Sequence, residues 1–358
     1  MEADWANLEA NPLSIILDKL IERIDHVWFS AVCKNWCSVA KLNHQSQQFR
    51  TNVLPMLTFR SKRGLYSIPS HRFYIFQSKM PYGKKICGSS HGWVAICESN
   101  LTITLFNPFK NVAPIPLPPL HKFYISQTHK VTLSADPITS PNDYVVVAIS
   151  NRECCIPFMR AGQTDWGYVH TTNPPYADII FYKGLVYVAQ NNIVSFFNLD
   201  HSGNKIINDA SLGSVDELGA CYVKIYLVKS LEGDLWMVRR LYIANNTKGF
   251  QVYKLELDAQ SGKLVGKVKL ESLGDDVLFI GGCDSISVSA SCFSRCLQKD
   301  SIYYCSDYND KAYDPRGPFD SGVYNVKDGS FDQQHFPCDP SFKCTLPSFW
   351  VLPPFQWD

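Results

Sequence analysis

The hydrophobic pattern changes its period near residue 55, and this change limits the fold more than any other feature of the chain. Before it, apolar residues recur three and four positions apart, which is the period of an amphipathic helix. After it, short runs of β-branched and aromatic residues are separated by Gly, Asn, Asp and Pro, which indicates strands joined by turns. We therefore expect a mainly β protein with a small α-helical N-terminal module.

The helical part contains two apolar stripes. Asn11 and Pro12 suit the start of a helix, because Asn caps exposed amides and Pro at the first helical position gives up no hydrogen bond. The first stripe comprises Leu13, Ile16, Leu17 and Leu20. The second follows Asp25 as one helical run and comprises Phe29, Val32, Cys33, Trp36 and Ala40.

About forty residues bury too little surface to be stable alone. This module carries its two stripes and four additional apolar residues, Leu8, Ile15, Val27 and Trp28. We therefore expect some of its apolar surface to be covered by a partner or by the β domain.

The β part shows a weak internal repeat. Its strand-like runs lie at 71–76, 92–97, 102–107, 143–149, 184–190, 193–199, 223–228, 234–243, 250–257, 285–290, 301–306 and 322–326. Turn residues recur near Gly92, Asn142, Gly184, Gly233 and Asp300, with gaps of 50, 42, 49 and 67 residues. A period of about 40–50 residues is typical of propeller blades and predicts about six or seven of them. An array of β-sandwiches remains the alternative.

Two further features belong to the propeller interpretation. The polar stretch at 307–322 is expected to be an insertion, and the segment around Trp350 is expected to close the ring against residues 55–76. Trp93, Trp166, Trp236 and Trp350 are expected to pack between blades.

Composition excludes several classes of function. The 358 residues are 46% hydrophobic and 19% charged, with a net charge of +1 and no basic block, so electrostatic binding to nucleic acid or an anionic membrane is not expected. No apolar run approaches the length of a membrane helix, and the acidic start lacks a secretory signal. We expect the nucleus or the cytoplasm. The 13 cysteines should then be mostly free and buried.

Metal, cofactor and catalytic motifs are weak or absent. Cys33/Cys37 and Cys292/Cys296 are each four apart, but core packing is favoured over a metal site. Residues 88–92 match G-x-S-x-G, yet a strand follows, so a turn between strands is favoured over a nucleophile elbow. Asp275 and Asp276 are interpreted as turn or capping residues. The pair 239–240, two arginines, could anchor an acidic or phosphorylated ligand, but a solvated strand end is favoured. We expect no cofactor and no metal.

The N-terminal region resembles an F-box. It reads W-x-x-L-x₄-L-x-x-I-L and then D-x-x-x-F-x-A-V-C-K-x-W. In that family these helices dock on the Skp-type adaptor of a cullin–RING ubiquitin ligase. The resemblance implies adaptor-binding positions at Leu8, Pro12, Leu13, Ile16, Leu17, Val32, Cys33 and Trp36. The chain departs from the family in having Leu8-Glu9 where Leu-Pro is common, with Pro12 displaced to a position that is usually apolar, and in having Trp28 and Cys37 where Arg often stands.

The β part resembles the KIB-type β-propeller, formerly domain of unknown function 295, of plant F-box proteins. The motifs GSSHGWV (88–94), LFNP (105–108), FYKGLVYV (181–188), FQVYKLELD (250–258) and PSFWVLPP (347–354) occur in that order. The expected domains are an F-box at 1–45, a linker with the first propeller strand at 46–70, and the propeller at 71–358.

The two resemblances together imply a substrate-recognition subunit of a Skp–cullin–F-box ubiquitin ligase. Its partners would be the adaptor, the cullin reached through the adaptor, and an unknown protein substrate. Such a subunit is not an enzyme, because its contribution is to hold a target near the ubiquitin-charged enzyme. The alternatives are an adaptor-independent propeller scaffold and a propeller hydrolase whose carboxylates would converge at the ring's axis.

Overall fold

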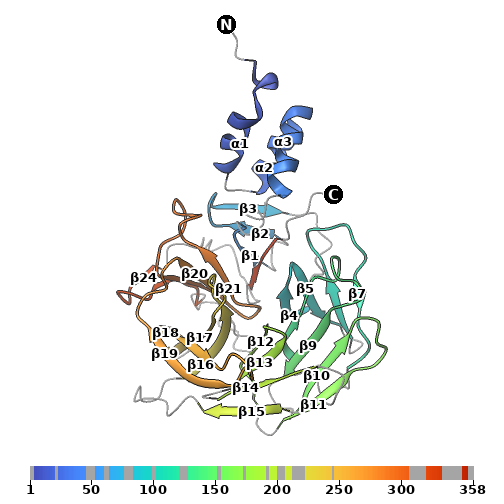
Figure 1. The fold of residues 1–358 in the computed structure, drawn as a ribbon, viewed down its shortest axis with the longest axis vertical. Helices are drawn as coiled ribbons and strands as arrows, with labels where there is room; N and C mark the ends of the chain where they lie inside the picture. Colours follow the sequence, from blue (N-terminus) through green and yellow to red (C-terminus); the bar gives the residue numbers. More distant parts are fainter. Residues whose placement is uncertain are drawn as a thin grey trace.

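A computed structural model shows a ring of β-sheets with a small group of helices at one edge (Figure 1). It describes residues 4–20, 23–45, 53–59, 64–75, 84–98, 102–120, 128–150, 155–171, 175–190, 193–199, 206–211, 222–243, 246–305, 320–332 and 349–353. The chain is therefore mainly β with a small α-helical N-terminal module, as the sequence predicts. No helix in these ranges is long and apolar enough to cross a membrane.

The helical module lies beside β3, outside the ring (Figure 1). It consists of η1 (Trp5–Asn7), α1 (Ala10–Asp18), α2 (Arg23–Ala31) and α3 (Lys34–Gln45). The first helix begins two residues earlier than predicted, because Glu9 is its N-cap in place of Asn11. Asn11 and Pro12 therefore lie in the first turn, where a missing proline N–H still costs no intrahelical bond.

The prediction of one continuous helical run after Asp25 is wrong, because the structure has two helices there, α2 and α3. The break falls between Ala31 and Lys34. Val32 donates its amide to the carbonyl of Phe29 at 3.3 Å, which closes α2. The carbonyl of Cys33 then accepts the first bond of α3 from Cys37 at 2.9 Å. Val and Cys have low helix propensity, so ending the helix at Val32 and Cys33 costs little free energy.

Six sheets form the ring, and we number them as blades in chain order. Blade 1 consists of β25 (Phe349–Val351), β1 (Met56–Phe59), β2 (Gly64–Ser67) and β3 (Arg72–Ile75). Blade 2 consists of β4 (Lys85–Ser90), β5 (Trp93–Cys97), β6 (Ile103–Phe106) and β7 (Ile115–Pro116). Blade 3 consists of β8 (Thr128–Leu133), β9 (Val145–Ser150), β10 (Cys155–Arg160) and β11 (Gly167–His170).

The other three blades continue round the ring. Blade 4 consists of β12 (Asp178–Tyr182), β13 (Leu185–Gln190), β14 (Ile193–Phe197) and β15 (Ile206–Ser211). Blade 5 consists of β16 (Tyr222–Lys229), β17 (Leu235–Ile243), β18 (Asn246–Leu257) and β19 (Leu264–Leu270). Blade 6 consists of β21 (Ile286–Ser289), β20 (Asp276–Ile280), β22 (Ser301–Tyr304), β23 (Gly322–Asn325) and β24 (Phe331–Asp332).

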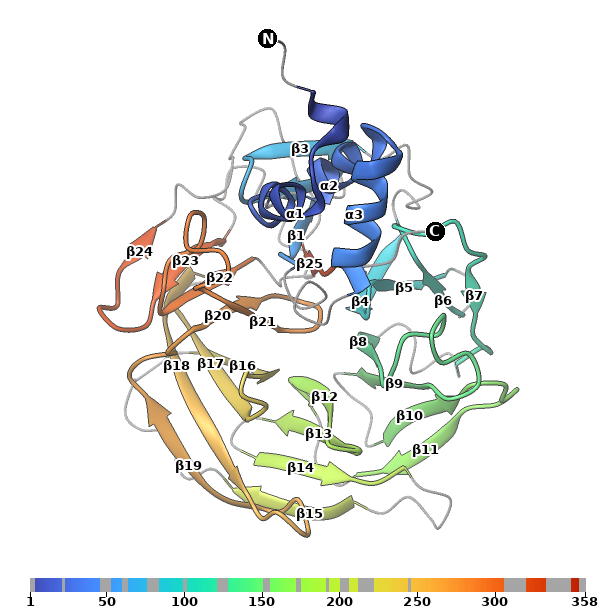
Figure 2. The same cartoon turned by 45° about the horizontal axis from the view of Figure 1, so that its top comes forward.

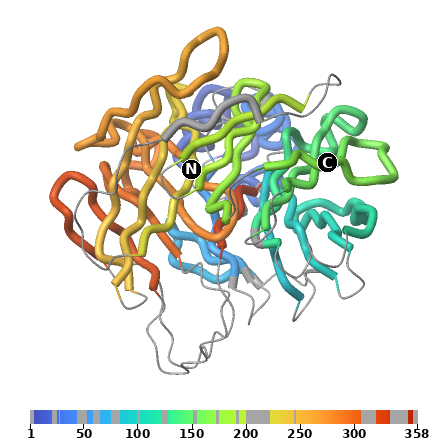
Figure 3. The backbone as a smooth tube through the Cα atoms, turned by 90° about the horizontal axis from the view of Figure 1, so that it is seen from below, coloured from blue at the N-terminus to red at the C-terminus, as the bar shows by residue number. Residues whose placement is uncertain are grey.

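The blades follow one another in chain order around the axis (Figures 2 and 3). Their innermost strands, each adjacent to the next, are β25, β4, β8, β12, β16 and β21. The predicted turn residues Gly92, Gly184 and Gly233 lie between the first and second strands of blades 2, 4 and 5, and all three have positive φ. The predicted repeat is thus the blade, and six blades agree with the expected six or seven. The predicted insertion at 307–322 lies outside the described residues, apart from its end.

Blade 6 departs from a simple up-and-down order. Its first strand, β20, lies second from the axis and pairs in parallel with β22, while β21 folds back to become innermost. Asp300, which the repeat placed at the opening of a blade, instead precedes β22 with a φ of 55°. The unequal spacing of 67 residues before it reflects this rearranged blade.

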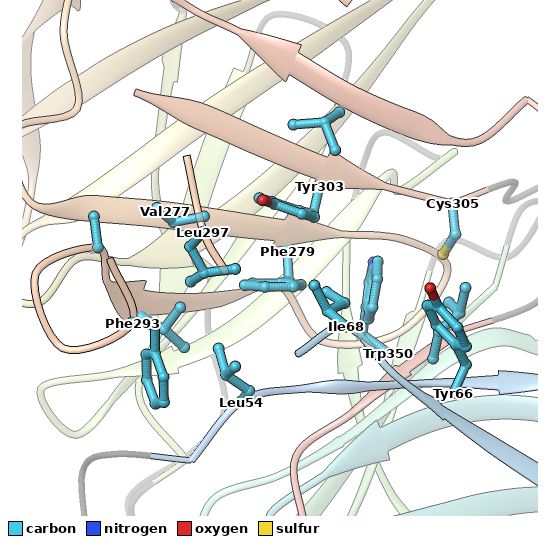
Figure 4. Close-up of a cluster of buried hydrophobic side chains, with 14 residues drawn as sticks. Leu54, Tyr66, Ile68, Val277, Phe279, Phe293, Leu297, Tyr303, Cys305 and Trp350 are labelled. Atoms are coloured by element: carbon cyan, nitrogen blue, oxygen red, sulfur yellow. The ribbon is translucent and has the colours of Figure 1, made fainter. Parts of the chain in front are cut away.

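The two ends of the propeller close the ring, as predicted. Strand β25 pairs antiparallel with β1, where Leu57 is opposite Trp350. Trp350 is fully buried and donates its Nε1–H to the carbonyl of Ile280 in blade 6 at 3.2 Å. Its ring meets the Phe279 ring edge-on at 4.9 Å (Figure 4). The apolar cluster around Trp350 therefore joins the last blade to the first.

The remaining core lies between neighbouring blades. Trp93 and Trp166 pack in the cluster between blades 2 and 3, and Trp236 packs in the cluster between blades 5 and 6. The predicted inter-blade role of the tryptophans is confirmed. Because each cluster is shared by two sheets, the ring behaves as one packed unit around its axis.

Candidate functional site

The helical module has its own small core. Leu13 and Leu17 of α1 are completely buried against Phe29 of α2 and Val39 and Ala40 of α3. Partly buried side chains pack around this core, and they are Leu8, Ile16, Leu20 and Trp36. The first predicted stripe is therefore the inward face of α1, as its helical spacing requires.

Polar contacts tie the segment before α1 to the α2–α3 joint. Trp36 donates its Nε1–H to the carbonyl of Trp5 at 2.9 Å. Asn35 donates its Nδ2–H to the carbonyl of Leu8 at 2.8 Å. The ring of Trp36 also lies 4.5 Å from that of Phe29, centroid to centroid. One end of the module is thus held by both packing and hydrogen bonds.

Large apolar side chains remain on the outside of the module. They are Trp5, 60% exposed, Ile15, 57%, Trp28, 56%, Val32, 55%, and Leu42, 65%. They make up five of the eleven large hydrophobic residues exposed in the described structure, although the module is a small fraction of the chain. Single exposed apolar residues are ordinary, but this density is typical of a surface that a partner covers.

The predicted adaptor-binding residues fall into three groups. Leu13 and Leu17 are core residues. Pro12 and Val32 are exposed. The half-buried residues are Leu8, Ile16, Cys33 and Trp36. Exposed Trp5 and Leu42 were missed by sequence reasoning, since neither lies on a predicted stripe.

The ring's axis is crossed by a charged cluster. Lys130 of β8 is buried and forms ion pairs with Asp178 of β12 and, at 3.2 Å, with Asp284 between β20 and β21. Thr132 also donates its hydroxyl to Asp284 at 3.1 Å. The amide of Leu227 in blade 5 donates to Asp178 at 2.7 Å. Four blades, including the opposite pair 3 and 6, are joined by this cluster.

The charges in this cluster compensate one another. Burial opposes the charge on Lys130, but the carboxylates of Asp178 and Asp284 outweigh it and raise the pKa of the ammonium group. Each of the two carboxylates is already engaged by this ammonium. The arrangement is that of a strut between blades, and it differs from the convergent acid–base pair that the hydrolase alternative requires.

The G-x-S-x-G segment is a turn between strands, as predicted. His91 and Gly92 connect β4 to β5 with φ values of 52° and 79°. Ser89 donates its hydroxyl to the carbonyl of Trp350 at 2.8 Å, so it links blade 2 to the closing strand. Ser90 contacts Thr132 of blade 3 at 3.4 Å. These serines hold neighbouring blades together.

Asp275 and Asp276 also hold turns, in agreement with the sequence interpretation. Asp275 accepts hydrogen bonds from the Ser289 hydroxyl and from the amide of Ser291, the latter at 2.8 Å. Burial opposes ionisation of Asp275, but these bonds outweigh it and lower its pKa. Asp276 accepts the amide of Leu231 at 2.8 Å, which joins blade 6 to blade 5.

The expectation that residues 239–240 form a solvated strand end is wrong. Arg240 is fully buried and donates to the carbonyl of Cys305 at 2.8 Å and to Asp320 Oδ2 at 3.0 Å. Its guanidinium also lies over the Tyr304 ring at 4.7 Å, so it joins blades 5 and 6. Arg239 is buried as well, and its Nη1 donates to Gln251 at 3.2 Å.

Cysteine placement differs in part from the expectation. None of the nine cysteines of the described ranges is in a disulfide bond, but four are buried, four are half-buried and Cys292 is exposed. Within those ranges, His, Cys, Asp and Glu side chains form no group of three that could hold a metal ion.

Comparison with known proteins gives relatives of nearly the same length. The chain is 23% identical over 367 residues to the Putative F-box protein At3g25750 of Arabidopsis thaliana, covering 93% of this chain and 94% of that one. It is 22% identical over 381 residues to F-box protein SKIP23 of the same plant, covering 92% and 91%. A solved structure, Hsv2 of Kluyveromyces lactis, matches 70% of this chain and 63% of its own at 13% identity, with a TM-score of 0.34.

Residues 65–325 match the family model described as the KIB1-4 beta-propeller. The matched region runs from β2 to the end of β23 and so spans most of the ring. Together with the names of the relatives, this match confirms the resemblance to plant F-box proteins with a KIB-type propeller. The chain belongs to the KIB1-4 beta-propeller family.

Proposed function

We propose that this protein is the substrate-recognition subunit of a Skp–cullin–F-box ubiquitin ligase. In this proposal the helical module docks on a Skp-type adaptor, and through it on a cullin, while the propeller binds a protein target. The names of the relatives, which are F-box proteins, support the proposal. The protein would act without catalysis of its own, by raising the concentration of the target near the ubiquitin-charged enzyme.

The observation that carries the proposal is the exposed apolar surface of a module whose core is already closed. Leu13 and Leu17 are buried within the module itself. Ile15 lies on the same helix, Trp28 lies on α2 and Val32 follows the end of α2, yet each is more than half exposed. Trp28 lies in the last turn of α2, and Val32 directly follows that helix. We propose that another polypeptide covers this surface.

We divide the predicted adaptor-binding residues into those that contact the adaptor and those that support the contact surface from the module's core. Pro12 and Val32, with Ile15 and Trp28, are proposed to contact the adaptor. Leu13, Leu17 and Trp36 are proposed to shape that surface from within. We also propose the division of labour at the chain level, with the module at 1–45, a linker beginning at 46, and the ring thereafter, and a location in the nucleus or the cytoplasm.

The proposal is tested by affinity purification from plant cells with the proteasome inhibited. Val32→Asp places a charge on the proposed docking surface and should remove both the adaptor and the cullin from the purified complex. Val265→Asp is the matched control, because Val265 is 67% exposed on β19 of the propeller. Its adaptor and cullin should be retained.

Two results would overturn the proposal. Retention of the adaptor by the Val32→Asp variant would place the docking surface elsewhere. A wild-type protein that captures partners but neither adaptor nor cullin would indicate an adaptor-independent scaffold instead.

A further inference from the structure

Two cysteines of blade 2 lie in contact with each other, and neither belongs to the proposed docking surface. Cys87 is in β4 and Cys97 is the last residue of β5, and their Sγ atoms are 3.3 Å apart. Both are free thiols. A disulfide bond is about 2.05 Å long, so the two sulfurs need to approach by only about 1.3 Å to form one.

A β-bulge brings these side chains together. In the pairing of β4 with β5, Ile86 is opposite Ile96 and Gly88 is opposite Ala95, so Cys87 is the extra residue. An extra residue turns the side chain that it carries relative to a regular strand. Cys87 and Cys97 consequently both pack on the apolar cluster between blades 2 and 3.

The two thiols are not equivalent. Cys87 is only 1% exposed, whereas Cys97 is half-buried at the end of its strand and can be reached from solvent. The hydrogen bond between the two thiols lowers the pKa of Cys97, and nearby Lys85 lowers it further, against the effect of burial. The same bond and burial raise the pKa of Cys87. Cys97 is therefore the thiol that ionises more readily, and the thiolate is the nucleophile.

We propose that Cys87 and Cys97 form a reversible oxidation site that takes up peroxide and stores the oxidation as a cross-strand disulfide. The Cys97 thiolate attacks one peroxide oxygen, the O–O bond breaks, and sulfenic acid and hydroxide form. The Cys87 sulfur then attacks the Cys97 sulfur. The S–S bond forms as the S–O bond breaks, and water leaves with the Cys87 proton. Two thiols are oxidised by two electrons and one peroxide is reduced.

Reduction restores the pair by exchange with a dithiol. The reductant's thiolate attacks one sulfur of the disulfide, and its second thiol releases the protein as two free thiols. The disulfide would affect the contact between blades 2 and 3. Gly88, which follows Cys87, lies so close to the Val131 carbonyl of blade 3 that a Cβ on Gly88 would be 2.0 Å from that oxygen.

The test treats the reduced full-length protein with hydrogen peroxide, alkylates the remaining thiols, and maps disulfides by peptide mass spectrometry. We expect a peptide pair linking Cys87 to Cys97 that dithiothreitol separates again. Cys97→Ser should abolish the link. Cys87→Ser should stop the reaction at a sulfenic acid on Cys97, which dimedone traps.

Cys292→Ser is the matched control, since Cys292 is exposed and lies on another blade. This variant should form the 87–97 link as the parent does, and in the parent Cys97 should react faster than Cys292. Thermal melting of each variant checks that it is folded. Peroxide that modifies Cys292 while Cys87 and Cys97 stay fully alkylated would overturn the proposal. A link from Cys87 to Cys283, whose charge also raises the Cys87 pKa, would overturn it too.

Discussion

Truncation of Trp28 should weaken partner binding without weakening the fold. A large aromatic side chain carries up to about 250 Å² of surface, so an exposed fraction of 56% leaves roughly 140 Å² for a partner. At about 25 cal/mol per Å², covering that area would contribute roughly 3.5 kcal/mol. Aromatic residues central to interfaces cost at least about 2 kcal/mol when truncated. We expect Trp28→Ala to raise Kd for the adaptor by about 30- to 400-fold.

The assay is isothermal titration of the purified full-length protein with a Skp-type adaptor. A parallel denaturation curve should move by no more than about 0.5 kcal/mol, because Trp28 is at the surface. Leu17→Ala supplies the contrast, since removing this fully buried side chain should destabilise the module by about 2–5 kcal/mol. An unchanged Kd for Trp28→Ala, with the protein folded, would refute the reasoning.

Three further predictions concern the ring. Gly88→Ala should destabilise the propeller by at least about 1–3 kcal/mol, because its Cβ would lie 2.0 Å from the backbone oxygen of Val131; an unchanged melting temperature would contradict this. Lys130→Met leaves two carboxylates at the axis unpaired and should cost about 3–5 kcal/mol in urea denaturation; a variant as stable as the parent would show that the strut is dispensable. Burial raises the pKa of Tyr303 and of Tyr304 to about 12. The folded state then keeps protons that the unfolded state releases above about pH 10, so stability should fall as the pH rises from 10 to 12, and Tyr303→Phe should reduce that fall.

Most middle strands of the blades were predictable from the sequence, whereas three of the strands at the axis, β4, β8 and β12, were not. Strands such as β13 and β17 are runs of β-branched and aromatic residues, and their predicted ranges agree with the structure. Strand β8 reads T-H-K-V-T-L, and its Thr128, Lys130 and Thr132 are buried. Burying a polar side chain costs little free energy only when partners form hydrogen bonds or ion pairs with it. The partners of Lys130 and Thr132 come from other blades, so they are invisible in a local pattern.

Part of the candidate site could also be predicted from the sequence, namely the residues that repeat at the helix period. Helical spacing identified the inward stripe of α1, because Leu13 and Leu17 repeat at the helix period. It could not place Val32, because the chain breaks there and the register of α2 does not continue into α3. A family pattern also includes core and surface positions without distinguishing them. Only the packed structure separates the buried leucines from the exposed Val32.

The most direct test of the central claim is hydroxyl-radical footprinting of the full-length protein with and without a Skp-type adaptor. Radical labelling reports side-chain exposure, so it reads the proposed surface residue by residue. The account predicts that Ile15, Trp28 and Val32 lose reactivity when the adaptor is added, while exposed Leu231 and Val265 of the propeller keep theirs. Protection confined to the propeller, or no protection of the helical module at saturating adaptor, would contradict it.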